Sequence, residues 1–305
     1  MQIVAIVALA MLLAVALPLA AIHWGFSAPR LIERGTPGDL GLAFEQVELR
    51  SARRKRLHAW LLPGEAAAGA VVLMHGWGGN AEMMLPLALP LKRAGLHVLL
   101  LDARNHGLSE ADSFSSMPRF AEDVEAAADW LERRPGGPPS AVALIGHSVG
   151  GGAVLLAASR RRDIAAVISI GAFAHPDWLM RRQLTRFHIP RPLTGLILRY
   201  VEWVIGHAYD DIAPINTLCR VACPVLLVHG LQDTVIPVSD LEAIKRNCGG
   251  DHTQVLLVEG AGHQSIEAIE RHGPDLVAFL GRAGVRGRAQ NAHGAPAGRA
   301  APSQA

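Results

Sequence analysis

The sequence predicts an α/β protein with a mostly parallel central sheet and helices on both faces. Short, wholly apolar runs bounded by turn residues recur along the chain, and segments with helical periodicity separate them. Strands that are apolar throughout are typical of parallel sheets, because helices bury both faces of such a sheet. Half of the 305 residues are hydrophobic, which excludes a disordered chain and provides for a sizeable core.

An N-terminal transmembrane helix is predicted over residues 1–26. Residues 3–22 carry no charge, and at about 1.5 Å per residue such a helix reaches roughly 30 Å, the thickness of a bilayer's hydrocarbon core. Trp24 follows at the position of an interfacial aromatic residue. The alternative is a cleaved signal peptide, which the small residues near Ala21 favour and the absence of a basic n-region disfavours.

Positive charge lies on the C-terminal side of this segment. No Lys or Arg precedes Arg30, and Arg34 and a basic cluster at residues 53–56 follow it. The positive-inside rule therefore predicts a single-pass membrane protein whose folded domain is cytoplasmic. Secretion after signal cleavage is the alternative.

The remaining segments follow in order. Residues 27–43 are rich in Gly and Pro and are expected to form a linker, residues 44–283 a single domain, and residues 284–305 a disordered tail. Two antiparallel strands, at residues 44–49 and 57–62, are expected to open the domain. Further strands are expected at residues 70–74, 97–101, 141–145, 165–170, 224–228 and 254–258, and helices at residues 81–93, 119–134, 151–161, 239–248 and 274–282.

The strongest chemical signal is a GxSxG pentapeptide, residues 146–150, centred on Ser148. It follows an apolar strand and opens an Ala-rich helix, the setting in which this motif presents a nucleophilic serine. The glycines fit that setting, because a serine on so sharp a turn has strained backbone angles and leaves no room for side chains on either side. Ser148 is therefore the candidate nucleophile.

A candidate acid and a candidate base follow at the ends of later strands. Asp233 comes after the strand expected at residues 224–228, and His263 after the strand expected at residues 254–258. The carboxyl ends of parallel strands meet at one edge of the sheet, where ligands and chemistry gather. There His263 would accept the proton of Ser148, and Asp233 would orient the imidazole and stabilise its cation.

A glycine-rich turn, residues 75–80, follows the strand expected at residues 70–74. The backbone N–H groups of Trp77 in this turn and of Val149 after the serine are the expected pair of donors to a tetrahedral oxyanion. Three polar residues near this turn are interpreted as structural hydrogen-bonding residues rather than as catalytic ones. They are His75, Asp102 and His106.

Composition and charge exclude other functions. The net charge of +2, without a basic stripe, excludes a nucleic-acid partner. The histidines show no metal-ligand spacing, so no metal is expected, and no cofactor is assigned. An odd number of cysteines in a long chain argues against a disulfide framework, so Cys219, Cys223 and Cys248 are expected to be small, buried or partly buried thiols.

These motifs resemble those of the α/β-hydrolase fold superfamily, nearest to membrane-anchored hydrolases related to serine aminopeptidases and monoacylglycerol lipases. The resemblance implies Ser148 as nucleophile, Asp233 as acid and His263 as base, with Trp77 and Val149 as the oxyanion donors. Asn105 departs from the Gly that many relatives carry there, which casts little doubt on catalysis. The motifs are HGWGGN at residues 75–80, DARNHGLS at 102–109, GHSVGG at 146–151, HGLQDTVIP at 229–237 and GAGH at 260–263.

One insertion interrupts the alternation of strands and helices. Residues 174–215, with helical stretches at residues 178–187 and 193–205, are predicted to form a lid over the active site, a helical decoration being the alternative. The apolar face of the first stretch is expected to cap the acyl pocket, and its basic face to point outward, against solvent or anionic head groups. The arginines of that basic face are Arg181, Arg182 and Arg186.

The sequence therefore predicts a serine hydrolase that cleaves a carboxylic ester, a thioester or an amide through an acyl-enzyme. Its partners are a small acyl-containing substrate, with lipid-like molecules among the candidates, and a membrane reached through the N-terminal helix. Acyl transfer to an alcohol by the same residues is one alternative. A non-catalytic, membrane-anchored scaffold is another, and labelling by a fluorophosphonate probe distinguishes it from an enzyme.

Overall fold

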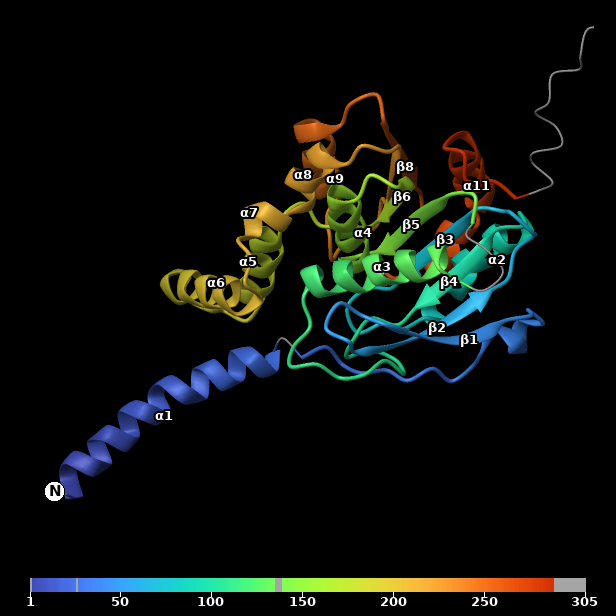
Figure 1. The fold of residues 1–305 in the computed structure, drawn as a ribbon. Coiled ribbons are helices and arrows are strands. Elements are labelled where there is room, and N and C mark those ends of the chain that lie inside the picture. Colours follow the sequence, from blue (N-terminus) through green and yellow to red (C-terminus); the bar gives the residue numbers. More distant parts are fainter. Residues whose placement is uncertain (1, 26, 135–138, 288–305) are drawn as a thin grey trace, which may run out of the picture.

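The computed structural model describes residues 2–25, 27–134 and 139–287, so most of the tail expected from residue 284 lies outside the described residues. The strands are β1 (Glu45–Arg50), β2 (Arg56–Leu62), β3 (Ala70–Met74), β4 (His97–Leu101), β5 (Val142–His147), β6 (Ile164–Ile170), β7 (Val225–Gly230) and β8 (Thr253–Val258). They form one sheet in the order β1-β2-β4-β3-β5-β6-β7-β8, in which β1 and β2 are antiparallel to their neighbours and all other pairs are parallel (Figure 1). The predicted fold class is confirmed.

Helices bury both faces of this sheet. One face packs against α3 (Met117–Glu132), α4 (Val149–Arg160) and α9 (Val238–Cys248). The other face packs against α2 (Leu85–Arg93), α10 (Ile266–Glu270) and α11 (Gly273–Arg282), and a short helix, η2 (Glu82–Met84), precedes α2. Because both faces are covered, β3, β4 and β5 are buried along their whole length, which is why they are apolar runs in the sequence.

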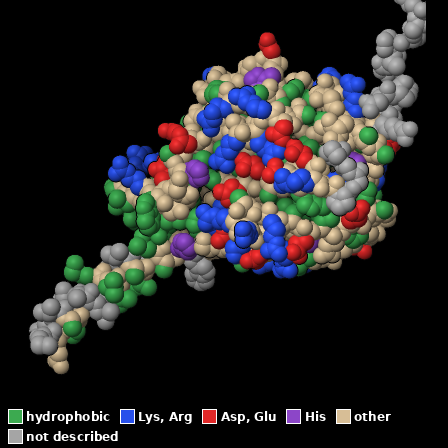
Figure 2. Space-filling view, viewed as in Figure 1, with side chains coloured by type: hydrophobic (Ala, Val, Ile, Leu, Met, Phe, Trp, Pro, Cys, Tyr) green, Lys and Arg blue, Asp and Glu red, His purple; other side chains and the backbone are tan. Residues whose placement is uncertain are grey.

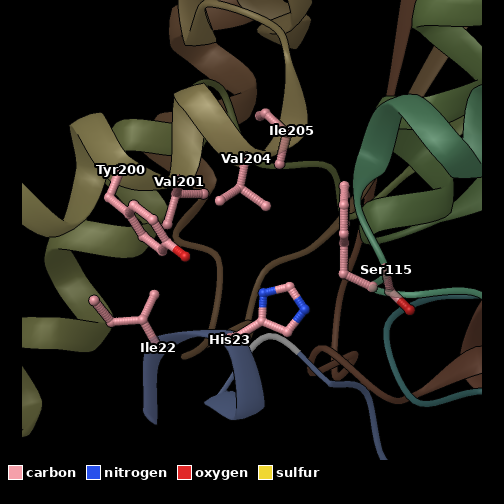
Figure 3. Close-up of a pocket in the computed structure, with 8 residues that line it drawn as sticks. Ile22, His23, Ser115, Tyr200, Val201, Val204 and Ile205 are labelled. Atoms are coloured by element: carbon pink, nitrogen blue, oxygen red, sulfur yellow. The ribbon is translucent and has the colours of Figure 1, made fainter. Parts of the chain in front are cut away.

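The N-terminal segment is a helix, α1 (Gln2–Gly25), that projects away from the domain (Figure 1). None of the helices formed by the described residues is long and apolar enough to cross a membrane, so the predicted transmembrane helix is not confirmed. The C-terminal end of α1 meets the insertion. Ile22 and His23 line a small apolar pocket together with Val201 and Ile205 (Figure 3).

The segment between β6 and β7, which includes the insertion, contains α5 (Pro176–Arg186), α6 (Arg191–Ile205), α7 (Tyr209–Ile212), α8 (Pro214–Thr217) and η3 (Leu218–Arg220). Of the three arginines of α5 that were expected to form an outward basic face, Arg181 and Arg186 are exposed, whereas Arg182 turns toward the protein. Arg182 donates to both carboxylate oxygens of the buried Asp240 on α9, at 3.0 and 2.8 Å, and Arg181 donates to Asp177 at 2.7 Å. Sequence periodicity could not show this, because the main partner lies on a distant helix.

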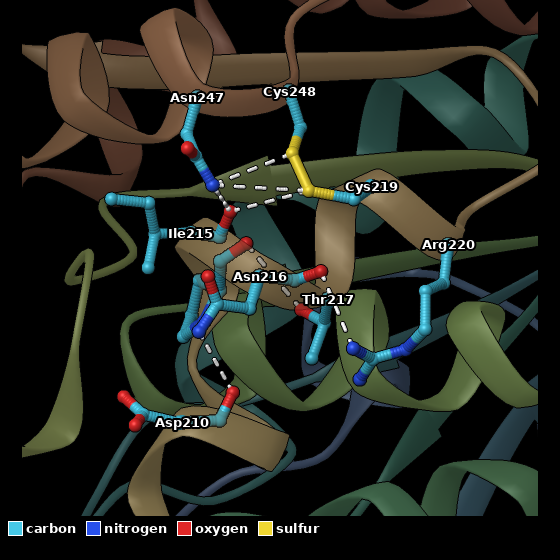
Figure 4. Close-up of a disulfide and its surroundings, with 9 residues drawn as sticks. Asp210, Ile215, Asn216, Thr217, Cys219, Arg220, Asn247 and Cys248 are labelled. Carbon is cyan, nitrogen blue, oxygen red and sulfur yellow. Dashed lines mark hydrogen bonds between the residues drawn. A yellow bond between two sulfur atoms is a disulfide. The ribbon is translucent and has the colours of Figure 1, made fainter.

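Two of the three cysteines form a disulfide, so the prediction of three thiols is wrong for this pair. Cys219 on η3 and Cys248 at the end of α9 have Cα atoms 4.9 Å apart and are joined by an S–S bond (Figure 4). Cys223 keeps its free thiol, and burial raises the pKa of this thiol to about 11. The number of cysteines in a sequence cannot show that α8 packs against α9 and brings these two residues together.

Candidate active site

Ser148 occupies the turn between β5 and α4, at the carboxyl edge of the sheet. Its φ of 56° and ψ of −117° are a combination that L-residues rarely adopt. The flanking glycines make the turn sterically feasible, because a Cβ on Gly146 would overlap the backbone of Gly150, and a Cβ on Gly150 would overlap the carbonyl of His75. The N–H of Ser148 donates to the carbonyl of Ile170 at 2.8 Å, which fixes the turn to β6.

The residues predicted as nucleophile, base and acid form one hydrogen-bonded series. Nε2 of His263 lies 2.9 Å from Oγ of Ser148, and Nδ1 of His263 lies 2.6 Å from Oδ2 of Asp233. Asp233 comes from the loop after β7 and His263 from the loop after β8. The structure therefore brings the three residues together at the sheet edge where the strand-end argument places them, and their catalytic roles stay a prediction.

A short turn holds the carboxylate of Asp233. The N–H groups of Val235 and Ile236 donate to its Oδ1 at 2.9 and 2.8 Å, which leaves Oδ2 for His263. Burial opposes ionisation of this carboxyl group, but the hydrogen bonds from His263 and from the turn outweigh burial and hold the pKa of Asp233 below its ordinary value. Asp233 is therefore an ionised acceptor toward the imidazole.

His147 contributes to the site, although no role for it was predicted from the sequence. Its Nε2 donates to the carbonyl of His263 at 2.7 Å, and the two rings lie 5.1 Å apart. Burial, together with the neighbouring His263, lowers the pKa of His147 to about 4, so this ring is neutral near pH 7. It helps to hold the loop that carries His263. The GxSxG pattern gave no signal for it, because the pattern leaves this position variable.

The expected oxyanion donors lie beside the serine. Val149 follows it as the first residue of α4, and Trp77 lies in the turn at residues 75–80, hereafter the oxyanion turn. Gly76 of this turn packs on Ser148, since a Cβ on Gly76 would lie 3.1 Å from the serine Cβ. Within the described part of the chain, no turn, loop or cap hydrogen bond uses the N–H of Trp77 or Val149. Both groups therefore stay available as donors.

Hydrogen bonds to backbone groups hold the oxyanion turn. Nδ1 of His75 donates to the carbonyl of Gly76 at 2.7 Å, while Nε2 accepts the N–H of Ala103 at 3.1 Å. Burial lowers the pKa of His75, and only the neutral ring can donate and accept in this way. Asp102 accepts the N–H of Ala81, just after the turn, at 2.7 Å. His75 and Asp102 are structural hydrogen-bonding residues, as interpreted from the sequence.

The loop at residues 102–109 is anchored to α3. The guanidinium of Arg104 is fully buried and lies 2.6 Å from the carboxylate of Asp123 on α3. Nδ1 of His106 donates to the carbonyl of Arg104 at 2.9 Å, which is the structural role expected for this histidine. Asn105 has a φ of 69°, which Asn tolerates better than most residues.

One group of described side chains has the composition of a metal site. Glu33, His58 and Asp102 each offer an oxygen or nitrogen atom, and these atoms lie within 4.8 Å of one another. Hydrogen bonds already occupy Asp102, which accepts the N–H groups of Ala81 and Leu108 and Nδ1 of His58. We therefore treat the group as a hydrogen-bonded cluster, and we assign no metal ion and no cofactor to this chain.

Comparisons of the sequence with known proteins identify its family. The sequence profile described as "Serine aminopeptidase, S33" matches residues 65–218. An uncharacterised protein of Mycobacterium tuberculosis is 27% identical over 225 residues, covering 70% of each chain. The alpha/beta hydrolase domain-containing protein WAV2 of Arabidopsis thaliana is 24% identical over 241 residues, covering 73% of each chain.

Solved structures share the fold. An esterase of Pyrococcus furiosus superposes on this chain with a TM-score of 0.69 at 22% identity, covering 84% of this chain and 97% of that one. The ferulic acid complex of Est1E from Butyrivibrio proteoclasticus gives a TM-score of 0.60 at 18% identity, over 76% of this chain and 98% of that one. At these identities the likeness shows the α/β-hydrolase fold alone.

Proposed function

The chain belongs to the serine aminopeptidase S33 family, and from that premise we propose that it is a serine hydrolase that cleaves carboxylic esters through an acyl-enzyme. The observation that carries the proposal is the unbroken series of hydrogen bonds from Ser148 through His263 to Asp233, at 2.9 and 2.6 Å. Esterases among the structural neighbours make an ester the first substrate class to test, with thioesters and amides after it.

The proposed mechanism follows from these positions. Oγ of Ser148 attacks the acyl carbonyl carbon while its proton passes to Nε2 of His263, and the carboxylate of Asp233 stabilises the imidazolium. The N–H groups of Trp77 and Val149 donate to the oxyanion of the tetrahedral intermediate. The intermediate collapses when the imidazolium protonates the leaving alcohol. Water, deprotonated by the same imidazole, then releases the acid and restores the serine.

A panel of short esters with increasing acyl chain length, assayed together with fluorophosphonate labelling, tests this function. Labelling at Ser148 and release of the acid in proportion to ester consumed support the hydrolase. If the acyl group passes to an added alcohol in preference to water, the protein is an acyltransferase on the same residues. If the folded protein shows neither labelling nor turnover, it is not an enzyme of this kind, and the alternative of a non-catalytic scaffold is favoured.

We propose further that the domain works on the oxidising side of a membrane. The Cys219–Cys248 disulfide supports this orientation, because disulfides persist in oxidising compartments and are rare in the cytosol. The arginines that favoured a cytoplasmic domain are weak orientation signals, since Arg30 is bound to two carbonyl oxygens of the domain. Packing of Ile22 against the domain core supports retention of α1 rather than its cleavage.

Thiol alkylation of protein taken from intact cells tests this orientation. We expect Cys219 and Cys248 to react only after reduction, while Cys223 reacts upon denaturation alone and serves as the internal control. The paired replacement Cys219→Ser and Cys248→Ser is expected to lower the free energy of unfolding by about 3 kcal/mol, measured by denaturant titration. Alkylation of all three thiols without reductant would place the domain in a reducing compartment.

A membrane is the proposed partner, through α1 and the adjoining edge of the lid. Figure 2 shows hydrophobic side chains gathered on α1 and on this edge of the lid. Leu196 and Trp203 on α6 are 66% and 77% exposed, whereas large apolar side chains are ordinarily buried. This apolar edge, rather than the arginines of α5, is therefore the proposed contact with lipid.

Replacing Leu196 and Trp203 together by Ser is expected to weaken sedimentation of the full chain with anionic vesicles about tenfold, because apolar area no longer leaves water on binding. Hydrolysis of a short soluble ester should stay at the wild-type rate. Leu257→Ser, an exposed leucine on β8, is the matched control. Unchanged sedimentation of the double variant would contradict the role proposed for the lid edge.

A further inference from the structure

Residues 27–36, which we call the N-terminal strap, leave α1 and lie along the oxyanion turn. The side-chain amide of Asn80, the last residue of the turn, donates to the carbonyl of Leu31 at 3.2 Å. The ring of Pro29 covers Gly78, where a Cβ would come within 2.8 Å of it. The strap therefore touches the same turn that carries the N–H of Trp77.

Two further contacts fasten the strap to the site. Glu82, just after the oxyanion turn, accepts the N–H groups of Arg34 and Gly35 at 2.8 and 3.1 Å. The guanidinium of Arg30 donates to two carbonyl oxygens of the loop at residues 102–109, at 2.9 and 2.5 Å. The strap thus bridges the two loops beside the nucleophile.

Asp102 joins those two loops from inside. Its side chain is fully buried, and its Oδ1 accepts the N–H of Ala81 at the end of the oxyanion turn at 2.7 Å. Its Oδ2 accepts the N–H of Leu108 at 3.0 Å and Nδ1 of His58 at 2.9 Å. A displacement of this carboxylate would therefore move the turn that carries Trp77.

The strap places a second carboxyl group against Asp102. Both carboxylate oxygens of Glu33 are buried, and among the described residues none donates a hydrogen bond to either oxygen. A Cβ on Gly107 would overlap both Oδ2 of Asp102 and Oε1 of Glu33, so the two groups share one cramped space. A buried carboxyl to which no group donates fits such a space when it keeps its own proton and donates an O–H hydrogen bond to the neighbouring carboxylate.

We propose that Glu33 is a positioning residue of the oxyanion turn, whose neutral carboxyl donates a hydrogen bond to the carboxylate of Asp102 and thereby docks the strap and fixes the turn for catalysis. This inference rests on the proposed function, since the turn matters only if Trp77 stabilises an oxyanion. It links the segment that leaves α1 to the catalytic centre.

The ionisation state of Glu33 then controls docking. Burial, reinforced by the neighbouring Asp102 and to a lesser extent by Glu82, raises the pKa of Glu33 from its ordinary 4.5 to about 8. The docked strap holds a proton that the free strap releases above pH 4.5, so docking weakens as the pH rises toward 8 and is weakest above it. The other titratable or charged groups around the pair are His58 on β2, His75, His106, and Arg30 and Arg34 in the strap.

The pH dependence of kcat for a short soluble ester tests the proposal on the full chain. We expect the wild-type kcat to fall about tenfold between pH 7 and pH 9.5, because a loosened turn loses part of one oxyanion donor. Glu33→Gln keeps a donor that does not titrate, so its kcat should stay level over this range. KM should change little in either protein. Glu45→Gln, an exposed glutamate on β1, is the matched control and should keep the wild-type profile.

Hydrogen exchange at the amide of Ala81 gives a readout that does not depend on turnover. Relative to its intrinsic rate, this amide should lose protection above pH 8 in the wild type and keep it in Glu33→Gln. An alkaline fall of kcat that persists in Glu33→Gln, or equal protection of Ala81 in both proteins, would overturn the proposal. If protection of the Ala81 amide depends on pH as expected but the protein has no turnover, the proposed function is contradicted and the proposed docking of the strap still holds.

Discussion

Replacing Ser148 by Ala is expected to abolish ester hydrolysis, lowering kcat by about 10⁶, while the protein stays folded. The loss is large because the hydroxyl forms the acyl bond itself, and no neighbouring group replaces it. The fold should survive, because the serine side chain makes no cap hydrogen bond to α4 and both residues meet the same strain at a φ of 56°. Turnover, fluorophosphonate labelling and a thermal melt measure the three quantities.

Ser159→Ala is the matched control for this variant, since it removes a hydroxyl at the far end of α4, the helix that begins directly after Ser148. It should keep full activity and full labelling. Substantial turnover by a folded Ser148→Ala protein would contradict the proposed nucleophile, whatever the control shows.

The sheet and the helices that flank it could be predicted from the sequence because burial on both faces leaves a simple pattern. The expected strand at residues 97–101 coincides with β4, and the helix expected at residues 239–248 starts within a residue of α9. The strand ends then placed Ser148, Asp233 and His263 at one edge, because parallel topology fixes which ends meet. The local hydrophobic pattern was therefore sufficient to predict those strands and helices whose own burial determines their sequence.

Contacts between residues far apart in the sequence could not be predicted in this way. The frequent Gly and Pro of residues 27–43 predict a linker, yet polar atoms of this segment bind two loops of the site. The Cys219–Cys248 pair and the ion pair of Arg182 with Asp240 have the same origin, since each depends on how two helices pack. The composition of a segment does not identify the hydrogen-bond partners of its polar groups, because the fold brings those partners from distant parts of the chain.

Asp233→Asn separates the structural from the chemical role of the acid. The amide oxygen of Asn can still accept the N–H groups of Val235 and Ile236, which now lie 2.9 and 2.8 Å from Oδ1 of Asp233, so the turn and the fold should be kept. The amide nitrogen, however, would replace Oδ2, which lies 2.6 Å from Nδ1 of His263. Two donors would then face each other, and the ring would favour the tautomer that carries its proton on Nε2.

In that tautomer His263 has no lone pair for the proton of Ser148, and no anion remains to stabilise an imidazolium. We therefore expect kcat to fall by about 10⁴ near pH 7, with KM changed far less, because binding of the ground state does not use the proton relay. Asp251→Asn, an exposed residue in the turn before β8, is the matched control and should keep wild-type kcat. If Asp233→Asn retains near-full activity, another carboxylate supports the imidazole and the acid proposed for this site is wrong.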